Sequence, residues 1–137
     1  PRASVRTVAN AMDVGAPSNF ERMLWLCNDS YVQMCDEIIG FSCTDRQILD
    51  AIREIYDNTG YVSDPHSAVG YLATRKYSKP GFWLSTAHAA KFCEVIEQAI
   101  DTTPDLPAGL AEAVGKEKYF VGISSDDAEL RLFLENL

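Results

Sequence analysis

The sequence has few basic side chains, no long apolar run and no targeting segment. Its 137 residues carry 12 lysines and arginines against 20 aspartates and glutamates, a formal net charge of −8. Because non-specific nucleic-acid binding needs positive groups that neutralise phosphates, nucleic acid is not an expected partner. No stretch approaches the roughly 18 apolar residues of a membrane span, and no basic start precedes an apolar run. We therefore expect a cytoplasmic protein without a membrane partner.

Metal-binding spacings are missing as well. The cysteines stand at positions 27, 35, 43 and 93, without a C-x-x-C pair and without a histidine at zinc-finger spacing. Four cysteines would permit two disulfides, but nothing points to an oxidising compartment. The sequence predicts free thiols, with Cys27 and Cys35 buried in a helix as small hydrophobic side chains, and no metal site.

Apolar residue types make up 47% of the chain, enough for the core of one domain. Two capping boxes, Ser18 with Glu21 and Thr44 with Gln47, predict helix starts, and Gly60 is placed to end the second helix in the left-handed conformation. Residues 28–30 split the first helical stretch in two. Its apolar stripe, which we expect to be core, comprises Met23, Cys27, Tyr31, Met34, Cys35 and Ile38.

Further helices follow. Asp64-Pro65 predicts an N-cap and a first helical residue for a helix that ends near Lys76, and residues 125–136 predict a last amphipathic helix. Another helix lies between His88 and Thr102. The apolar faces of the three central helices are Ile48, Ile52, Ile55 and Tyr56; Ala68, Val69 and Leu72; and Phe92, Val95, Ile96, Ala99 and Ile100.

Strand signals are few. We predict a short strand over residues 4–9, a fully buried strand at 82–84 after a turn at 79–81, and an edge strand at 119–121. Strand, turn and helix in succession at 82–100 are typical of an α/β protein. Two or three short strands cannot complete a parallel sheet, so part of the sheet is expected elsewhere.

Several side chains are candidates for chemistry. Ser85 and Thr86 follow the predicted strand, where ligands bind in open α/β sheets, so each hydroxyl is either a helix cap or a hydrogen-bond partner of a bound ring nitrogen. His66 and His88 lie at predicted helix starts and are either general bases or capping and packing residues. Lys91 could form a Schiff base only with a lowered pKa, and its surroundings in the sequence are too ordinary for that.

Three motifs then resemble a known family. Residues 11–22, 60–70 and 85–92 occur in the order and approximate spacing seen near the C-terminus of threonine synthase. The resemblance covers residues 5–107 well and the final thirty poorly, and it corresponds to about the last third of the usual enzyme. Ala89 departs from the family, which usually has proline after this histidine, so His88 is less restricted here.

The resemblance implies a pyridoxal-phosphate enzyme that converts O-phosphohomoserine and water into threonine and phosphate. Its fold would be the helix-rich part of an open, parallel-sheet, three-layer α/β fold shared with the tryptophan synthase β subunit, with an incomplete sheet. Residues 1–107 would be the C-terminal portion of the cofactor-binding domain and residues 108–137 a tail. The chain, which begins without Met, is expected to be an inactive fragment, because the lysine that forms the internal aldimine would lie upstream of residue 1.

The resemblance also implies roles for particular residues. Thr86 matches the family hydroxyl that hydrogen-bonds the pyridine nitrogen of the cofactor, with Ser85 as the second choice. The residues near the active site that would receive the substrate phosphate are Ser18, Asn19 and Arg22. The sequence also allows a different role for two of them, a helix cap for Ser18 and an ion pair with a surface acid for Arg22.

A rival hypothesis is an independent, non-catalytic α/β domain that binds a ligand or a partner. The fragment hypothesis makes a physical prediction of its own. A piece of a larger fold should expose apolar surface on the order of several hundred Å² that the missing N-terminal portion would cover, and it could associate with itself through that surface.

Overall fold

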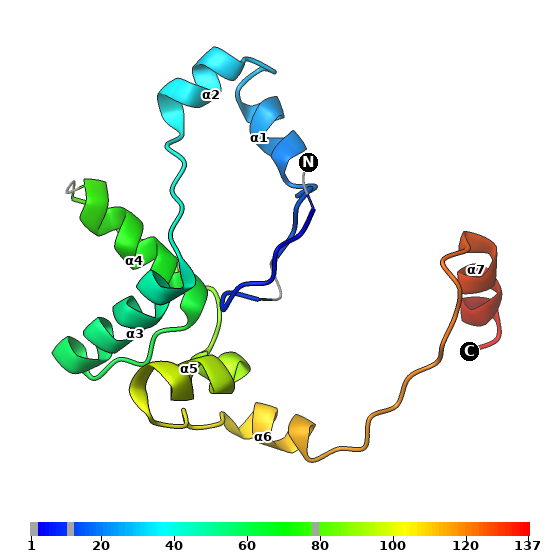
Figure 1. Ribbon diagram of the computed structural model, residues 1–137. Coiled ribbons are helices and arrows are strands. Elements are labelled where there is room, and N and C mark those ends of the chain that lie inside the picture. The colour runs from blue at the N-terminus through cyan, green and yellow to red at the C-terminus, as the bar shows by residue number, and fades with distance from the viewer. Residues whose placement is uncertain (1–2, 11–12, 78–79) are drawn as a thin grey trace. The chain divides into compact units, whose positions relative to one another are not determined.

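The computed structural model describes residues 3–10, 13–77 and 80–137, and their regular structure is helical (Figure 1). The start of the motif at residues 11–12 and Lys79 of the predicted turn lie outside the described residues. The chain divides into two compact units, residues 1–105 and 106–137. The elements are α1 (Phe20–Leu26), α2 (Tyr31–Glu37), α3 (Asp45–Thr59), α4 (Pro65–Tyr77), the 3₁₀ helix η1 (Ala89–Phe92), α5 (Cys93–Ile100), α6 (Ala108–Val114) and α7 (Asp127–Glu135).

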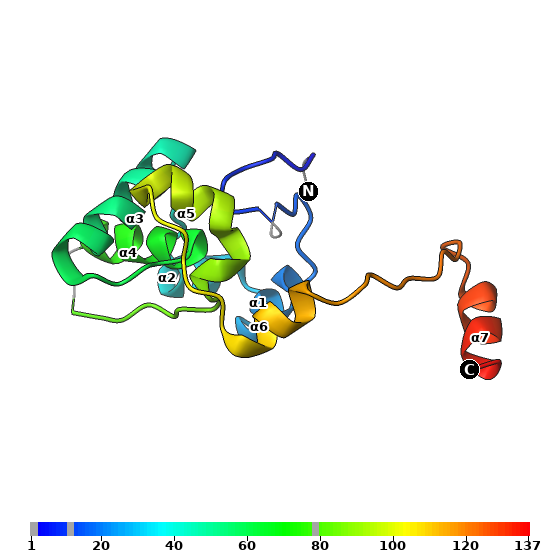
Figure 2. The same cartoon turned by 90° about the horizontal axis from the view of Figure 1, so that it is seen from below.

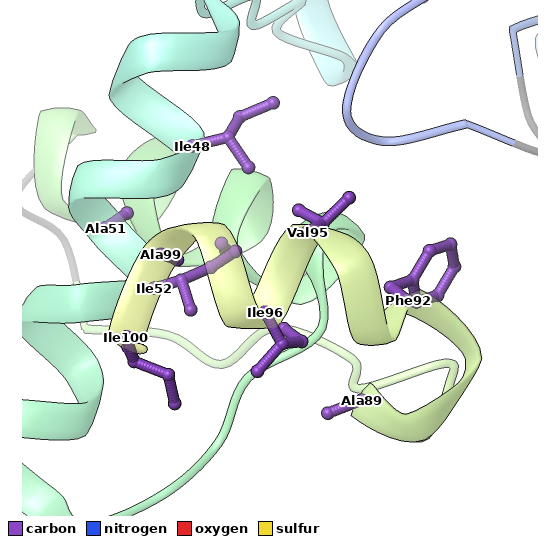
Figure 3. Packing of buried hydrophobic residues seen from close by; sticks show 10 residues of the cluster. Ile48, Ala51, Ile52, Ala89, Phe92, Val95, Ile96, Ala99 and Ile100 are labelled. Atoms are coloured by element: carbon purple, nitrogen blue, oxygen red, sulfur yellow. The ribbon is translucent and has the colours of Figure 1, made fainter. Parts of the chain in front are cut away.

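The core of the first unit lies where α3 packs against α4 and α5, which both views show side by side with α3 (Figures 1 and 2). Ile52 of α3 and Ile96 of α5 are completely buried, and burying one such side chain stabilises the fold by about 1.5–3 kcal/mol. Figure 3 shows how α5 turns its apolar face toward α3. The predicted apolar faces of these three helices are confirmed as buried or partly buried: Ile48, Ile52, Ile55, Tyr56, Ala68, Val69, Leu72, Phe92, Val95, Ile96, Ala99 and Ile100.

The predicted ends of α3 are confirmed. The Thr44 hydroxyl accepts a hydrogen bond from the Gln47 N–H at 3.3 Å, and the Gln47 side chain accepts one from the Thr44 N–H at 2.9 Å. Gly60 ends the helix at φ 72°, a left-handed conformation that glycine adopts without steric cost. Asp64 accepts hydrogen bonds from the backbone N–H groups of His66 and Ser67 at the start of α4, as the Asp64-Pro65 pair predicts.

The capping box at Ser18 is wrong. Helix α1 begins at Phe20, its N-cap is Asn19, and no side chain caps it. The Phe20 N–H donates a backbone hydrogen bond to the Pro17 carbonyl, which forms a turn before the helix. With Asn19 as the N-cap, Glu21 is the second helical residue, whereas a capping box needs its glutamate at the third.

The stripe on α1 and α2 is not core. Of its members only Cys27 is buried, while Tyr31 is 71% exposed and Cys35 and Ile38 are also exposed. The predicted break between the helices is confirmed, since Asn28 and Asp29 have positive φ angles. These two helices contact each other, and most of their apolar side chains stay half-buried or exposed.

No strand occurs in the described ranges, so the three predicted strands, at 4–9, 82–84 and 119–121, are wrong for this chain. The segment predicted to be fully buried is instead at the surface, with Phe82 83% and Leu84 72% exposed. A strand forms only when its backbone N–H and C=O groups pair with a neighbouring strand. With no partner, apolar residues at these positions do not form a sheet.

The second unit contains α6 and α7. The predicted last helix is confirmed, with α7 capped by the Asp126 carboxylate, which accepts from the Ala128 N–H at 3.0 Å. None of its side chains is buried. Within the described part of the chain, no helix is long and apolar enough to span a bilayer, and no group of metal-ligating side chains comes together. All four cysteines are free thiols.

Candidate functional site

An open cavity of about 650 Å³ lies in the first unit, between the loop after α3 and the segment that leads into η1. Two hydroxyl residues predicted from the sequence, Ser85 and Thr86, both line it and are exposed. The structure therefore brings these two residues together in one cavity. The complete lining is Tyr61, Val62, Ser85, Thr86, Ala87, His88, Ala89, Lys91, Pro104 and Asp105.

The two hydroxyl groups differ in their partners. Ser85 Oγ lies 3.2 Å from the phenolic oxygen of Tyr61, within hydrogen-bond distance. The Thr86 hydroxyl makes no hydrogen bond to any described residue. Of the two, the Thr86 hydroxyl is the one left available to a molecule in the cavity.

Two contacts fix the chain on either side of these hydroxyls. Upstream, the Trp83 ring packs edge-on against Tyr71 of α4 at a centroid distance of 5.7 Å, and it lies directly over Gly70. Downstream, His88 Nδ1 accepts a hydrogen bond from the Ala90 N–H at 3.1 Å and so caps η1. The capping role for His88 is the one that the structure shows, although the residue also lines the cavity.

Asp64, His66 and Ser67 form a second polar cluster, at the start of α4. The buried Asp64 carboxylate accepts from the Ser67 hydroxyl and from two backbone N–H groups, and His66 Nδ1 lies 3.4 Å from Asp64 Oδ1. The His66 ring packs against Phe92 at 5.1 Å, and its buried Nε2 has no partner among the described residues. His66 is not part of the cavity lining, so the two histidines belong to different sites.

The residues expected near the substrate phosphate lie on or just before α1. Ser18, Asn19 and Arg22 are exposed, and Arg22 lines a separate, mostly apolar cavity of about 450 Å³. In the described residues Arg22 forms no ion pair, so the alternative of a surface partner finds no support. None of the three lines the cavity that contains Thr86.

Tyr61 is one of the cavity residues that sequence reasoning missed. It stands inside a motif, directly after the helix-ending Gly60, but no local pattern links it to Ser85, which is 24 residues away. The only sequence signal that could have identified Tyr61 as a site residue was its place inside one of the three motifs. Lys91 also lines the cavity and is exposed.

Solved structures share this fold. The crystal structure of threonine synthase from Escherichia coli matches 99% of this chain with a TM-score of 0.73 at 34% identity, and the chain covers 32% of that structure. The crystal structure of pyridoxal-phosphate-bound threonine synthase from Brucella melitensis matches 98% of the chain with a TM-score of 0.69 at 23% identity, and 35% of it is covered. The chain thus has the fold of a part of these larger enzymes.

Sequence comparison agrees with the fold. A family model described as threonine synthase, C-terminal, matches residues 67–133. The threonine synthase of Escherichia coli is 34% identical over 139 residues, which include 99% of this chain and 32% of that protein. Residues 67–133 therefore resemble the C-terminal part of threonine synthase, and the whole chain is similar to about a third of the Escherichia coli enzyme. It spans about a third of the length of the curated relatives it matches.

Proposed function

We propose that this chain is the C-terminal part of a threonine synthase, a pyridoxal-phosphate-dependent lyase that converts O-phosphohomoserine and water into threonine and phosphate. The similarity to threonine synthases supports the reaction class. The observation that carries the proposal is the Thr86 hydroxyl, which stands on a cavity wall without a hydrogen-bond partner in the described residues. Free thiols and the biosynthetic reaction support a cytoplasmic location.

The cavity residues fit the pyridine ring of the cofactor. Pyridoxal phosphate, when bound, draws electrons away from the substrate carbon that reacts. The Thr86 hydroxyl would donate a hydrogen bond to the ring nitrogen, so it would bind and orient the ring while leaving the nitrogen unprotonated. A carboxylate at that position would instead favour a protonated ring. Ser85 is the second candidate for this contact.

The chain does not supply the covalent attachment. The resemblance puts the family's cofactor-binding lysine upstream of residue 1, so the lysines at positions 76, 79, 91, 116 and 118 would not attach the cofactor. We place that lysine in polypeptide outside this chain, together with strands that would pair with residues 82–84. The exposed side chains of Phe82 and Leu84 support this part of the proposal. The chain alone should have no activity, and borohydride reduction with the cofactor should not label Lys91 stoichiometrically.

Ser18, Asn19 and Arg22 are proposed to contact the phosphate of the substrate. The guanidinium of Arg22 is exposed and forms no ion pair in the described residues, so it is available for a bidentate contact with an anion. Replacing Arg22 with Gln in the longer protein should raise KM for O-phosphohomoserine more than it lowers kcat. An unchanged KM would argue against this contact.

Thr86→Val in the longer protein tests the cofactor contact. Valine has a similar shape but cannot hydrogen-bond, so pyridoxal phosphate should dissociate about 3- to 10-fold more readily, the effect of one hydrogen bond. Thr86→Ser keeps the hydroxyl and serves as the matched control. Cofactor affinity is measured by absorbance titration. If the Thr86→Val variant binds the cofactor as tightly as the parent, the proposed role of Thr86 is wrong. The catalytic proposal as a whole fails if the gene upstream of residue 1 encodes no cofactor-binding lysine.

A further inference from the structure

The hydrogen bond between Tyr61 and Ser85 joins two parts of the cavity wall that are 24 residues apart. The bond runs from the phenolic oxygen to Ser85 Oγ at 3.2 Å, and Ser85 directly precedes Thr86. Both partners line the cavity that contains the Thr86 hydroxyl. A change in the Tyr61 side chain would therefore affect Ser85, the residue directly before the proposed cofactor contact.

Tyr61 itself is firmly placed. Its backbone N–H donates to the Thr59 hydroxyl at 3.1 Å, and the preceding Gly60 donates to the Tyr56 carbonyl at 2.8 Å. Both acceptors belong to α3, the helix that forms the centre of the core. Tyr61 thus connects the cavity wall to the most deeply packed helix of the unit.

The segment that carries Thr86 has no such support of its own. In the described part of the chain, residues 85–87 make no backbone hydrogen bond and belong to no helix, and Ser85 and Thr86 are exposed. Trp83 and His88 hold the two ends of the segment through side-chain contacts. Between those ends, the bond from Ser85 to Tyr61 is the one hydrogen bond that the described residues provide.

We infer that Tyr61 is a positioning residue of this site: through Ser85 it holds the segment so that the Thr86 hydroxyl faces the ring of the cofactor. The inference rests on the proposed function and assigns Ser85 to this link instead of to a contact of its own with the cofactor. The hydroxyl of Tyr61 carries this role, because it makes the bond to Ser85. A phenylalanine ring at this position would still line the cavity but could not form that bond.

A double-mutant cycle in the longer protein tests this role, with Tyr61→Phe, Ser85→Ala and the pair together. Each single variant breaks the same bond, so each should weaken binding of pyridoxal phosphate about 3- to 10-fold, and the pair should lose no more than either alone. Tyr56→Phe is the matched control, since Tyr56 is also on α3, makes no hydrogen bond through its hydroxyl in the described residues and does not line the cavity. It should bind the cofactor like the parent.

Backbone dynamics in the apoprotein give a second measurement that does not depend on the cofactor. Nitrogen-15 order parameters of residues 84–87 should fall to the same extent in Tyr61→Phe and Ser85→Ala and should equal those of the parent in Tyr56→Phe. Unchanged order parameters in the first two variants would overturn the inference. So would a larger loss of cofactor affinity in Ser85→Ala than in Tyr61→Phe with additive losses in the pair, which would show that Ser85 touches the cofactor itself. If the order parameters fall as expected and Thr86→Val still binds the cofactor normally, the proposed function of the site fails, while the role of Tyr61 in holding residues 84–87 stands.

Discussion

Thr7 and Asp13 form a hydrogen-bonded pair in the first unit. The Thr7 hydroxyl donates to Asp13 Oδ1 at 2.6 Å, and the Thr7 N–H donates to Oδ2 at 3.1 Å. These bonds, the side-chain one most strongly, lower the pKa of the Asp13 carboxyl below its ordinary value. A carboxyl with a lowered folded-state pKa contributes stability above its unfolded pKa, and that contribution disappears as the pH falls through the folded pKa.

Thr7→Val should therefore raise the pKa of Asp13 toward its ordinary value and reduce the loss of stability on acidification. A carbon-13 NMR titration of the Asp13 carboxyl measures this directly. Ser4→Ala is the control, because the Ser4 hydroxyl accepts from Gly15 and does not touch Asp13. An Asp13 pKa that stays the same in Thr7→Val would show that the hydroxyl is not the cause of the shift.

Gly70 leaves room for the Trp83 ring, which lies just before the cavity residues Ser85 and Thr86 in the chain. A Cβ at this position would lie 3.0 Å from Trp83 Cβ and 3.1 Å from its Cδ1, so the ring must move by a few tenths of an ångström. Trp83 is 43% exposed and can shift outward. Replacing Gly70 with alanine should gain about 1 kcal/mol of helix propensity. The loss of contact between the Trp83 ring and α4 should offset most of that gain.

We expect Gly70→Ala to change the free energy of unfolding by less than about 1 kcal/mol while making Trp83 more solvent-accessible. Tryptophan fluorescence in a Trp25→Phe background reports on Trp83 alone, since the sequence has two tryptophans. The emission maximum should shift to longer wavelength. Gly109→Ala, where no atom lies within 4 Å of the added Cβ, is the control. An unshifted maximum would mean that the ring is not displaced.

At the scale of elements, capping explains why α3 could be predicted in full and α1 could not. Both helices show the capping-box pattern in sequence, but Thr44 has the extended backbone that a cap requires, with ψ 160°. Ser18 lies in a turn, and the residue after it, Asn19, is the N-cap in helical conformation with ψ −10°. The pattern alone does not distinguish these two backbone conformations.

Thr44→Ala should destabilise the first unit by about 1 kcal/mol, because it leaves the Gln47 N–H without its cap. Chemical denaturation followed by circular dichroism measures the loss. Ser42→Ala, two residues upstream and outside the helix, should leave the free energy of unfolding within about 0.5 kcal/mol of the parent. Ser18→Ala should also have little effect, since Ser18 caps nothing; a loss equal to that of Thr44→Ala would contradict the assigned helix start.

At the scale of the whole chain, large apolar side chains are exposed in both units. In the first unit they include Trp25, Leu26, Phe82 and Leu84, with exposed fractions between 67% and 83%, and in the second unit Tyr119 and Phe120. Large exposed apolar side chains, where they lie together, are typical of surfaces that another polypeptide covers. The proposed covering polypeptide is the portion of the enzyme outside this chain, which spans about a third of its curated relatives.

Residues 1–137 produced alone should therefore bind a hydrophobic dye and associate with themselves in light scattering. Phe82→Ser with Leu84→Ser should reduce dye binding, because the two side chains are exposed and their loss costs the core nothing. Production together with the upstream polypeptide should suppress both effects. A monomer that binds no dye would argue against a covered surface and for the independent domain.

The sequence by itself determined the features that depend on neighbours a few residues away. The capping box of Thr44, the left-handed end at Gly60, the start of α4 at Asp64-Pro65 and the apolar faces of α3 and α5 all result from short-range steric and hydrogen-bonding preferences. Thr86 could be singled out because its position in a motif was readable from the sequence.

Only the tertiary structure decided the rest, because the remaining features depend on partners that are distant in the chain or absent from it. Tyr61 meets Ser85 only because the core places the loop after α3 beside the segment before η1. The apolar runs at 4–9 and 82–84 have strand-like composition, but backbone groups need a neighbouring strand to pair with, and the described residues contain none. Burial likewise requires a covering element, and most apolar side chains of α1 and α2 remain exposed or half-buried here.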